Sequence, residues 1–371
     1  MKCVSLFAGI GGFDLALTRL GHEIVWANEW DKYAAQTYEK NFNTENDQSA
    51  RGFRQEENIS KQRNSSISSK SDLGQHSESY VHPRVDTRNI TTVPTTDIPN
   101  HDLLVGGFPC QAFSVAGLRR GFSETRGTLF FEIARILKDK KPNYFILENV
   151  KGLLSHDNGN TFKTIISTLT ELGYDLQWQV LNSKNFGVPQ NRERVFIVGN
   201  LRGTSRPQVF PIPCDNGTIA PGPVTSQQWK NRSTGSLYVA KVGTYRTHKD
   251  GQGFREVKSG LSPTIPARAR EDGSGQPVIT VPVLTPDRLK KRQNGRRFKE
   301  NGEPAFTLTG QDKHGVYDGM RIRRLTPTEC ERLQGFPDGW TEGVSDTQRY
   351  KQLGNAVTIN VVYEIARRLI I

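Results

Sequence analysis

Residues 104–114, Leu-Val-Gly-Gly-Phe-Pro-Cys-Gln-Ala-Phe-Ser, predict the end of a buried strand followed by a tight turn. The apolar residues 103–105 belong to that strand, and Pro109 fixes the backbone just before Cys110. Open α/β sheets carry their chemistry at the carboxyl ends of their strands, which is where Cys110 stands. A cysteine is often only a small buried apolar residue. Because Cys110 lies in a loop and polar residues follow it, we interpret it as a nucleophile.

The flanking sequence alternates between apolar runs of strand length and amphipathic runs of helix length. This alternation predicts an α/β fold, in which a parallel sheet carries helices on both faces. Strands are expected over 2–7, 23–27, 102–106, 144–150, 175–182 and 194–199, and helices over 13–20, 31–41, 128–138, 160–172 and 327–334, with a terminal helix from 354.

The first strand ends in a glycine-rich turn that matches part of a dinucleotide-binding fingerprint. Gly9 and Gly11 supply the first two glycines, but Asp14 stands where the third small residue is required. The turn therefore indicates a nicotinamide cofactor only weakly, and it fits S-adenosylmethionine, which has no pyrophosphate, equally well. Glu29 ends the second strand, where a carboxylate accepts both hydroxyls of a ribose. The alternative for Glu29 is a solvated loop acid.

The C-terminal part is predicted to return to helices. Residues 326–329 have the pattern of a capping box, with Pro327 at the first helical position. Residues 354–357 are expected to open an amphipathic terminal helix with four apolar residues near one face, Val361, Val362, Ile365 and Leu369. We expect this tail to pack on the first sheet, so that the catalytic, cofactor-binding domain consists of 1–200 and 324–371.

Positive charge is concentrated in one region of the 371-residue chain. Lys and Arg exceed Asp and Glu by 12 overall, and residues 201–330 alone hold 22 basic and 11 acidic residues. This suits a polyanion-binding domain beside a nearly neutral one, although a merely solvated basic surface is the alternative. From 201 to 323 the apolar runs are short, which predicts a second domain of loops and short strands.

Residues 43–84 interrupt the α/β pattern. They hold six basic and six acidic residues, and Phe53 and Tyr80 are their only aromatic residues apart from histidines. Such a composition buries too little apolar surface to offset the entropy of ordering. We therefore expect a flexible surface insertion without a catalytic role.

The four cysteines are far apart and form no Cys-x-x-Cys pair. They predict neither a metal site nor a disulfide framework, and they favour a reducing compartment, here the cytoplasm. Asp14 and several glycines interrupt the apolar N-terminal run, which is unlike a signal peptide. No segment approaches the ~18 consecutive apolar residues of a membrane span.

Six sequence blocks, taken together and in order, resemble bacterial DNA (cytosine-5)-methyltransferases of the restriction–modification type. The blocks are Phe7-Ala-Gly-Ile-Gly-Gly12, Gly107-Phe-Pro-Cys-Gln-Ala-Phe-Ser114, Glu148-Asn-Val150, Gln190-Asn-Arg192-Glu-Arg194, Arg324-Leu-Thr-Pro-Thr-Glu329 with Arg332-Leu-Gln-Gly-Phe-Pro-Asp338, and Gly354-Asn-Ala-Val357. The resemblance covers about 1–42, 85–200 and 315–371, and the insertion departs from the compact family pattern without interrupting a block.

The resemblance implies a Rossmann-like methyltransferase fold with a smaller DNA target recognition domain over 201–323. It implies S-adenosylmethionine as cosubstrate and double-stranded DNA as substrate, with methylation of cytosine carbon 5 after the base is flipped out of the duplex. We expect a monomer that needs no metal. A restriction endonuclease of the same specificity is the expected functional partner, against which methylation protects the DNA.

The resemblance also implies catalytic roles. Cys110 is the nucleophile that attacks carbon 6 of cytosine and makes carbon 5 reactive. Glu148 donates a proton or hydrogen bond to ring nitrogen 3, and Asn149 holds the loop or donates to the base. Arg194 contacts the carbonyl oxygen of the base, and Arg192 belongs to the same group and braces Glu148 or the loop. The alternatives are an ordinary ion pair for Glu148 and an exposed strand end for Arg192.

Further residues are assigned to cofactor and DNA. The cofactor pocket is expected to consist of Phe7, Gly9, Gly11, Glu29, Asp86, Pro109, Leu129, Asn355 and Val357, with Phe7 on the adenine ring, Glu29 on the ribose and Asp86 on the adenine amino group. The loop over 111–127 is expected to close on the DNA. The residues expected to contact DNA are Gln111, Arg126, Arg268, Arg270, Gln311 and His314.

Three other functions remain open at this point. An RNA cytosine-5 methyltransferase would share the catalytic blocks, although the long basic region disfavours it. A DNA-binding protein on an inactive copy of the fold would share the basic region. A nicotinamide oxidoreductase is disfavoured by Asp14.

Overall fold

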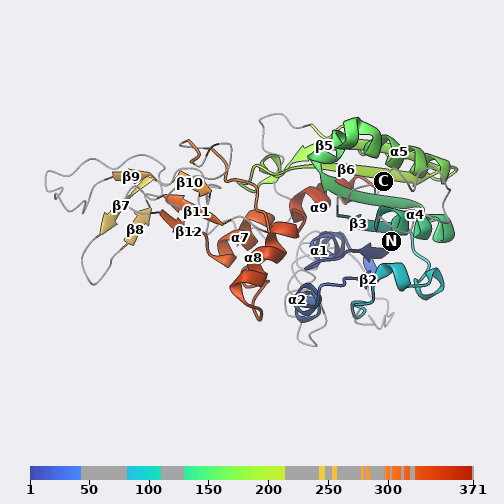
Figure 1. Ribbon diagram of the computed structural model, residues 1–371, viewed down its shortest axis with the longest axis horizontal. Coiled ribbons are helices and arrows are strands. Elements are labelled where there is room, and N and C mark those ends of the chain that lie inside the picture. The colour runs from blue at the N-terminus through green and yellow to red at the C-terminus, as the bar shows by residue number, and fades with distance from the viewer. Residues whose placement is uncertain are drawn as a thin grey trace, which may run out of the picture.

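The computed structural model describes residues 1–42, 82–109, 129–213, 242–246, 253–256, 277–279, 281–284, 296, 298–300, 303–310, 313–317 and 322–369. All but the last three residues of the predicted insertion lie outside these ranges. Figure 1 shows a large α/β body and, beside it, two small sheets.

The large body is built on a six-stranded sheet with the order β2-β1-β3-β4-β6-β5. Strands β1 to β4 are mutually parallel, whereas β6 runs antiparallel to both β4 and β5. The expected parallel sheet is thus correct for four strands and wrong for the β6 pairings. Only a short connection joins β5 to β6, and parallel neighbours need a long crossover. The strands are β1 (Lys2–Leu6), β2 (Glu23–Asn28), β3 (Leu103–Gly107), β4 (Tyr144–Val150), β5 (Tyr174–Asn182) and β6 (Glu193–Leu201).

Helices cover both faces of this sheet, as expected. Along β4, Ile146 packs with residues of α1 (Gly12–Arg19), α2 (Lys32–Phe42) and α9 (Ile359–Arg367). Its neighbours Phe145 and Leu147 pack on the other face with α4 (Leu129–Lys140) and α5 (Asn160–Glu171). Because successive strand residues point to opposite faces, one apolar run fills two cores.

The C-terminal part contains α7 (Pro327–Gln334), α8 (Asp346–Asn355) and α9. The predicted capping box is confirmed, since Glu329 N donates to Thr326 Oγ1 at 3.2 Å and Thr326 N donates to Glu329 Oε2 at 2.8 Å. The expected start of the terminal helix is wrong. Residues 354–355 end α8, which the sequence did not predict because it is mostly polar, and α9 begins at Ile359.

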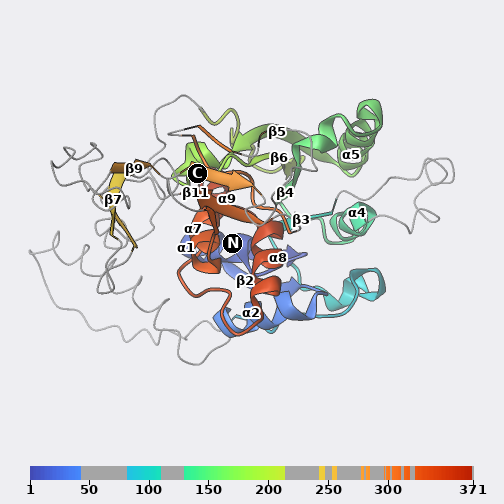
Figure 2. The same cartoon turned by 60° about the vertical axis from the view of Figure 1, so that its left-hand side comes forward.

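The tail packs on the N-terminal part, as predicted. Val361, Val362 and Ile365 are buried with α1 residues in one core. A Cβ atom on Gly12 would stand 2.8 Å from Val357 Cγ1, so the tail touches the glycine-rich turn directly. Figures 1 and 2 both show α8 beside α2, where Lys351 Nζ lies 2.7 Å from Asp31 Oδ2.

In Figure 1, two three-stranded sheets lie beside the large body, in the chain region where loops and short strands were expected. Their orders are β8-β7-β9 and β10-β11-β12. The strands are β7 (Val242–Arg246), β8 (Gly253–Glu256), β9 (Pro277–Ile279), β10 (Val281–Leu284), β11 (His314–Tyr317) and β12 (Ile322–Arg324).

Two chain segments outside the small sheets, one before β7 and one between β10 and β11, are fixed to the large body. The Gln177 side chain on β5 accepts from Val209 N and Phe210 N at 3.0 and 3.1 Å and donates to the Pro207 carbonyl oxygen at 2.8 Å. In the connection between β10 and β11, Ala305 pairs with Gln190 in an isolated parallel bridge. Residues 207–210 and Ala305, which lie inside the predicted second domain of 201–323, therefore pack with the large body.

Thr309 and Gly310, in the connection between β10 and β11, approach Gly354 so closely that no side chain fits there. A Cβ atom on Gly354 would stand 2.3 Å from Gly310 N and 2.3 Å from the Thr309 carbonyl carbon. We expect Gly354→Ala to lower the free energy of unfolding by about 3 kcal/mol, because backbone must move. Gly152→Ala is the matched control, since its Cβ would meet only Val150 Cγ2 at 4.0 Å. Urea unfolding measures both, and equal effects would contradict this packing argument.

Candidate active site

The carboxyl ends of β3 and β4 form one wall of the site. Their parallel pairing places Gly107 beside Glu148, and a Cβ atom on Gly107 would stand 3.1 Å from Glu148 Oε2. The buried Asn149 side chain donates from Nδ2 to the Phe108 carbonyl oxygen at 2.8 Å. Asn149 therefore holds the start of the loop that carries Cys110, which is the first of the two roles expected for it.

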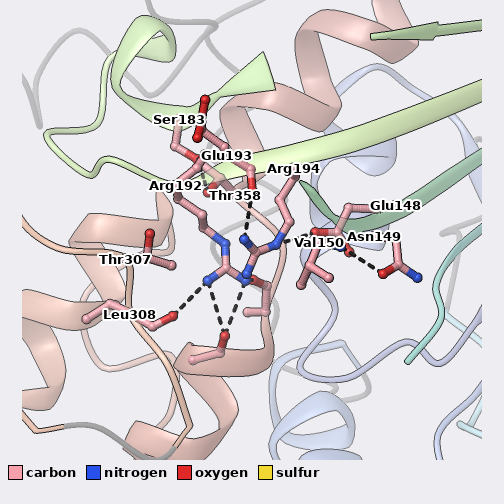
Figure 3. Close-up of polar contacts among 12 residues, drawn as sticks. Glu148, Asn149, Val150, Ser183, Arg192, Glu193, Arg194, Thr307, Leu308 and Thr358 are labelled. Carbon is pink, nitrogen blue, oxygen red and sulfur yellow. Dashed lines mark hydrogen bonds and ion pairs between the residues drawn. The ribbon is translucent and has the colours of Figure 1, made fainter. Parts of the chain in front are cut away.

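Glu148 and Arg194 meet across the antiparallel pair β4 and β6. Arg194 Nε lies 2.9 Å from Glu148 Oε1, and the two side chains are only 16 % and 13 % exposed (Figure 3). Arg194 Nη1 also donates to the Glu193 carbonyl oxygen at 2.8 Å. The ion pair considered as an alternative is present. The ion pair lies at the end of β4, beside the end of β3, after which the chain continues to Cys110.

Arg192 is buried, so an exposed strand end is wrong for this residue. Its Nη1 donates to the Leu308 carbonyl oxygen at 2.8 Å and its Nη2 to that of Ala356 at 2.7 Å, and both donate to that of Gly354 at 3.2 Å (Figure 3). Desolvation, and then the charge of Arg194, lower the pKa of Arg192 to about 9. Arg192 therefore braces the C-terminal end of α8 and the residue that follows it.

A second buried side chain, for which the sequence predicted no role, joins the same segments. Gln190 is fully buried, and it donates from Nε2 to the Leu333 carbonyl oxygen at 2.9 Å. Its Oε1 accepts from Leu308 N at 2.9 Å. Gln190 and Arg192 thus tie the start of β6 to α7, to Leu308 between β10 and β11, and to Ala356 just after α8. Only the spacing of the Gln190–Arg194 block could have signalled this.

Cys110 lies outside the described residues, as do Gln111 and Arg126. The structure describes both ends of this segment. Pro109 is exposed two residues beyond the end of β3, and half-buried Leu129 is the first residue of α4. Pro109, the last described residue before Cys110, therefore lies just past the end of β3. Glu148 lies near the end of the neighbouring strand β4.

The glycine-rich turn lies beside Glu29 at the ends of β1 and β2. Gly9 and Gly11 have φ angles of 58° and 86°, which only glycine adopts readily. Gly9 N donates to Glu29 Oε2 at 2.8 Å and Asp31 N donates to Oε1 at 2.7 Å. Burial raises the pKa of Glu29, and these two amide hydrogen bonds oppose the shift. Glu29 is therefore an organised carboxylate and not a solvated loop acid.

Phe7 and Asp86 flank the same turn. Half-buried Phe7 has a φ angle of 54°, a left-handed conformation that is uncommon outside glycine and clusters at ligand sites. Asp86 forms an isolated parallel bridge with Asn28 at the end of β2. Its carboxylate is 2.6 Å from Arg88 Nη2, and this contact lowers the pKa of Asp86. Glu29 N also donates to the Asp86 carbonyl oxygen. The Asp86 carboxylate, a charged acceptor, is therefore held near Glu29.

The other expected cofactor residues differ in exposure. Asn355 is exposed at the end of α8, whereas Val357 is buried against Gly12. Trp30, for which the sequence predicted no role, follows Glu29 directly and is 66 % exposed. A large aromatic face beside a ribose-type carboxylate offers a stacking surface for an adenine ring.

Of the residues expected to read DNA, Arg268, Arg270 and Gln311 lie outside the described residues. His314 is described, and its expected role is not supported. It begins β11 and is 7 % exposed, so it presents little surface to a DNA groove. Short strands were expected in this region, and the first three residues of β11 are all buried.

Asp14, which disfavoured a nicotinamide cofactor, is a fully buried acid beneath the turn. It accepts from Ser5 Oγ at 2.9 Å, and burial raises its pKa from 3.8 to about 7. The unfolded chain releases this proton near pH 4, so the folded protein alone keeps it between pH 4 and 7. The stability contributed by the protonated acid is therefore lost as the pH rises through this window.

We expect Asp14→Asn, which cannot ionise, to gain stability relative to the natural chain as the pH rises. The difference in free energy of unfolding should widen by roughly 2 kcal/mol between pH 5 and 8. Urea titrations across this range measure it, and Glu23→Gln on the exposed start of β2 is the control. A constant difference would show that Asp14 is ionised throughout.

Within the described residues, no group of three or more His, Cys, Asp and Glu side chains is arranged to hold a metal ion. None of the helices there is both long and apolar enough to cross a membrane.

The sequence profile of the C-5 cytosine-specific DNA methylase family matches residues 1–67 and 77–370. The chain belongs to the C-5 cytosine-specific DNA methylase family.

Full-length relatives agree with this. The methylase is 35 % identical to the orphan methyltransferase M.SPRI of Bacillus phage SPR, covering 100 % of this chain and 97 % of the relative. It is 36 % identical to the type II methyltransferase M.SsoII of Shigella sonnei, covering 100 % and 80 %. It is 33 % identical to the type II methyltransferase M.HhaI of Haemophilus parahaemolyticus, covering 99 % and 93 %.

Solved structures support the fold. A prophage-encoded methyltransferase (E. coli) has a TM-score of 0.57 at 18 % identity and covers 100 % of this methylase and 98 % of that chain. A mutant of Spodoptera frugiperda DNMT2 has a TM-score of 0.53 at 19 % identity, covering 99 % of each. The predicted methyltransferase fold is confirmed, and the methylase is a DNA cytosine methyltransferase. The family implies S-adenosylmethionine as cosubstrate.

Proposed function

We propose that this methylase transfers a methyl group to carbon 5 of a cytosine within a specific duplex sequence, through a transient bond between that base and Cys110. One observation carries the proposal. Strands β3, β4 and β6 bring Glu148, Asn149 and Arg194 together at the strand end from which the Cys110 loop departs.

The glycine-rich turn and its neighbours fit S-adenosylmethionine. Glu29 offers carboxylate oxygens to the ribose hydroxyls, and Gly9 and Gly11 let the backbone approach the methionine part. Phe7 and Trp30 offer aromatic faces to the adenine ring, and Asp86 offers an acceptor to its amino group. Pro109, Leu129, Asn355 and Val357 complete the pocket. S-adenosylmethionine supplies an electrophilic methyl group there.

Cys110 begins the reaction, because a thiolate is the nucleophilic form of cysteine. Its sulfur bonds to carbon 6 of the base, and the ring electrons move toward carbon 5 and nitrogen 3. Glu148 supplies a proton or hydrogen bond at nitrogen 3, and Arg194 donates to the carbonyl oxygen of the base. Carbon 5 then takes the methyl group, and the cosubstrate leaves as S-adenosylhomocysteine. Water removes the proton from carbon 5, a proton taken up at nitrogen 3 returns to Glu148, and the sulfur–carbon bond breaks to restore the thiolate.

The target cytosine must leave the helix before these groups can reach it, at a cost of a few kcal/mol. We propose that the 111–127 loop, with Gln111 and Arg126, closes over the flipped base. We propose that residues 201–323 bind the duplex, with Arg268, Arg270 and Gln311 at base edges in the major groove. Their excess of basic residues supports phosphate binding, whose affinity falls as salt rises.

Purified methylase incubated with labelled S-adenosylmethionine and either duplex DNA or transfer RNA tests the substrate class. We expect incorporation into DNA alone. Bisulfite sequencing of DNA from a host that expresses the gene then gives the methylated sequence. Incorporation into RNA alone, or none by the folded protein, would contradict the proposal.

We further propose that methylation protects DNA from a restriction endonuclease of the same specificity. Type II and orphan methyltransferases are both among the relatives, so protection from an endonuclease has to be tested directly. Host DNA carrying the modification should resist an endonuclease that cuts the sequence found by bisulfite sequencing, and a second endonuclease that cuts an unrelated site is the control.

The insertion is expected to be dispensable for this activity. The described residues that flank positions 43–81 are in contact. The rings of Phe42 and His82 lie 4.5 Å apart, and His82 Nε2 is 3.2 Å from Thr18 Oγ1. We expect replacement of residues 45–80 by a short Gly/Ser linker to leave turnover within about twofold, because a surface insertion contributes little to a core. Initial rates of methylation measure this, and a folded but inactive variant would contradict it.

A further inference from the structure

Trp340, in the segment between α7 and α8, contacts the glycine-rich turn from the far end of the chain. Its indole Nε1 donates to the Ile10 carbonyl oxygen at 2.8 Å. Ile10 is the residue between Gly9 and Gly11, both of which have positive φ angles. Trp340 is 7 % exposed, so this hydrogen bond is shielded from water.

Aromatic packing fixes the position of the Trp340 ring. Its centroid lies 5.5 Å from that of Phe336 and 5.5 Å from that of Phe42, at which α2 ends. A Cβ atom on Gly11 would stand 2.2 Å from the Phe42 ring, so the same aromatic group also touches the turn. The Trp340 carbonyl oxygen accepts from Asn41 Nδ2 at 2.8 Å.

A buried carboxylate fixes the backbone around Trp340. Glu331 is fully buried, and its Oε2 accepts from Gly339 N at 2.7 Å. Its Oε1 accepts from Thr341 N at 2.8 Å, from the Thr341 hydroxyl, and from Arg349 Nη2 at 3.1 Å. The residues on both sides of Trp340 are therefore held by one side chain, and the indole N–H has a fixed direction.

We propose that Trp340 is a positioning residue that sets the affinity for S-adenosylmethionine by fixing the peptide group of Ile10. This inference rests on the proposed function, in which the turn approaches the methionine part of that molecule. Two glycines give the free turn many conformations, and binding must select one of them. The Trp340 hydrogen bond makes that selection in advance. Its loss therefore weakens cofactor binding and leaves chemistry and DNA binding unchanged.

Two variants remove the N–H while keeping an aromatic ring. One is Trp340→Phe, and the other replaces Trp340 by 3-benzothienylalanine, an isostere of tryptophan with sulfur in place of N–H. Trp178→Phe is the matched control, because Trp178 is 48 % exposed on the edge strand β5, at the opposite side of the sheet from β2. Melting temperatures without ligand establish that each variant folds.

Isothermal titration with S-adenosylhomocysteine measures the affinity of the full-length chain. We expect the dissociation constant to rise about five- to tenfold in both Trp340 variants, the scale of one buried neutral hydrogen bond. The KM for S-adenosylmethionine should rise in parallel, while kcat at saturation, the affinity for DNA and the Trp178→Phe control stay within about twofold.

A lower melting temperature with an unchanged dissociation constant would show that Trp340 is merely structural and would overturn the inference. A fall in kcat without a change in KM would overturn it as well. If the natural chain itself fails to bind S-adenosylhomocysteine, the proposed function is at fault instead. The two failures are thus distinguishable.

Discussion

Replacing Cys110 by serine is expected to abolish methyl transfer, with a loss in kcat on the order of 10³-fold or more, because a hydroxyl is a far weaker nucleophile than a thiolate at neutral pH. Affinity for DNA should persist, because the basic region is untouched. Labelled methyl transfer measures the first quantity and electrophoretic mobility shift the second. Turnover near that of the natural chain would remove Cys110 from the mechanism.

Cys330→Ala is the matched control for this variant. Cys330 lies in α7, and burial raises the pKa of its thiol to about 12, so it remains protonated and inert. We expect this variant to lose some stability and to keep its turnover. DNA with 5-fluorocytosine at the target position adds a direct test, because fluorine cannot leave as a proton does. The natural chain should form an adduct at Cys110 that survives denaturation, and Cys110→Ser should form none.

Replacing Glu148 by glutamine is expected to lower kcat about 10²-fold, the usual scale for loss of a proton-transferring group. An amide cannot give up a proton at nitrogen 3, and it carries no charge to pair with Arg194 at 2.9 Å. Single-turnover methylation measures the effect, since it separates chemistry from product release.

Glu193→Gln is the matched control for Glu148→Gln. Glu193 starts the neighbouring strand β6, and its carboxylate pairs with exposed Lys151 at 3.1 Å. An exposed pair of this kind contributes little, so we expect turnover within about twofold of the natural chain. Equal losses in the two variants would show that removing negative charge anywhere at this edge lowers turnover, and Glu148 would then have no particular role.

The sequence was informative where one residue type has one structural use. Strands buried on both faces need continuous apolar runs, which is why β3 and β4 were predicted nearly to the residue. The glycines of the turn were recognised because few other residues adopt their φ angles. Glu148 and Arg194 were singled out by the family resemblance, and the structure brings them together.

Other features were not predictable because polar side chains have many uses. Arg192 and Gln190 are charged or polar yet buried, and only the fold shows which carbonyl groups they satisfy. Helix α8 has little apolar periodicity, since Gln352, Leu353 and Gly354 are its only buried residues. The antiparallel direction of β6 depends on the connection before it and not on its own apolar run.

The hydrogen bond from Trp340 to Ile10 joins residues that are 330 positions apart in the chain. During translation, the turn around Ile10 therefore leaves the ribosome long before the residues that complete its surroundings. A nascent chain stalled before α7 would display Gly12 and α1 without the tail that covers them. The part before α7 and the part from α7 onward carry complementary apolar surfaces. Synthesised as separate polypeptides in the same cell, they should reassemble.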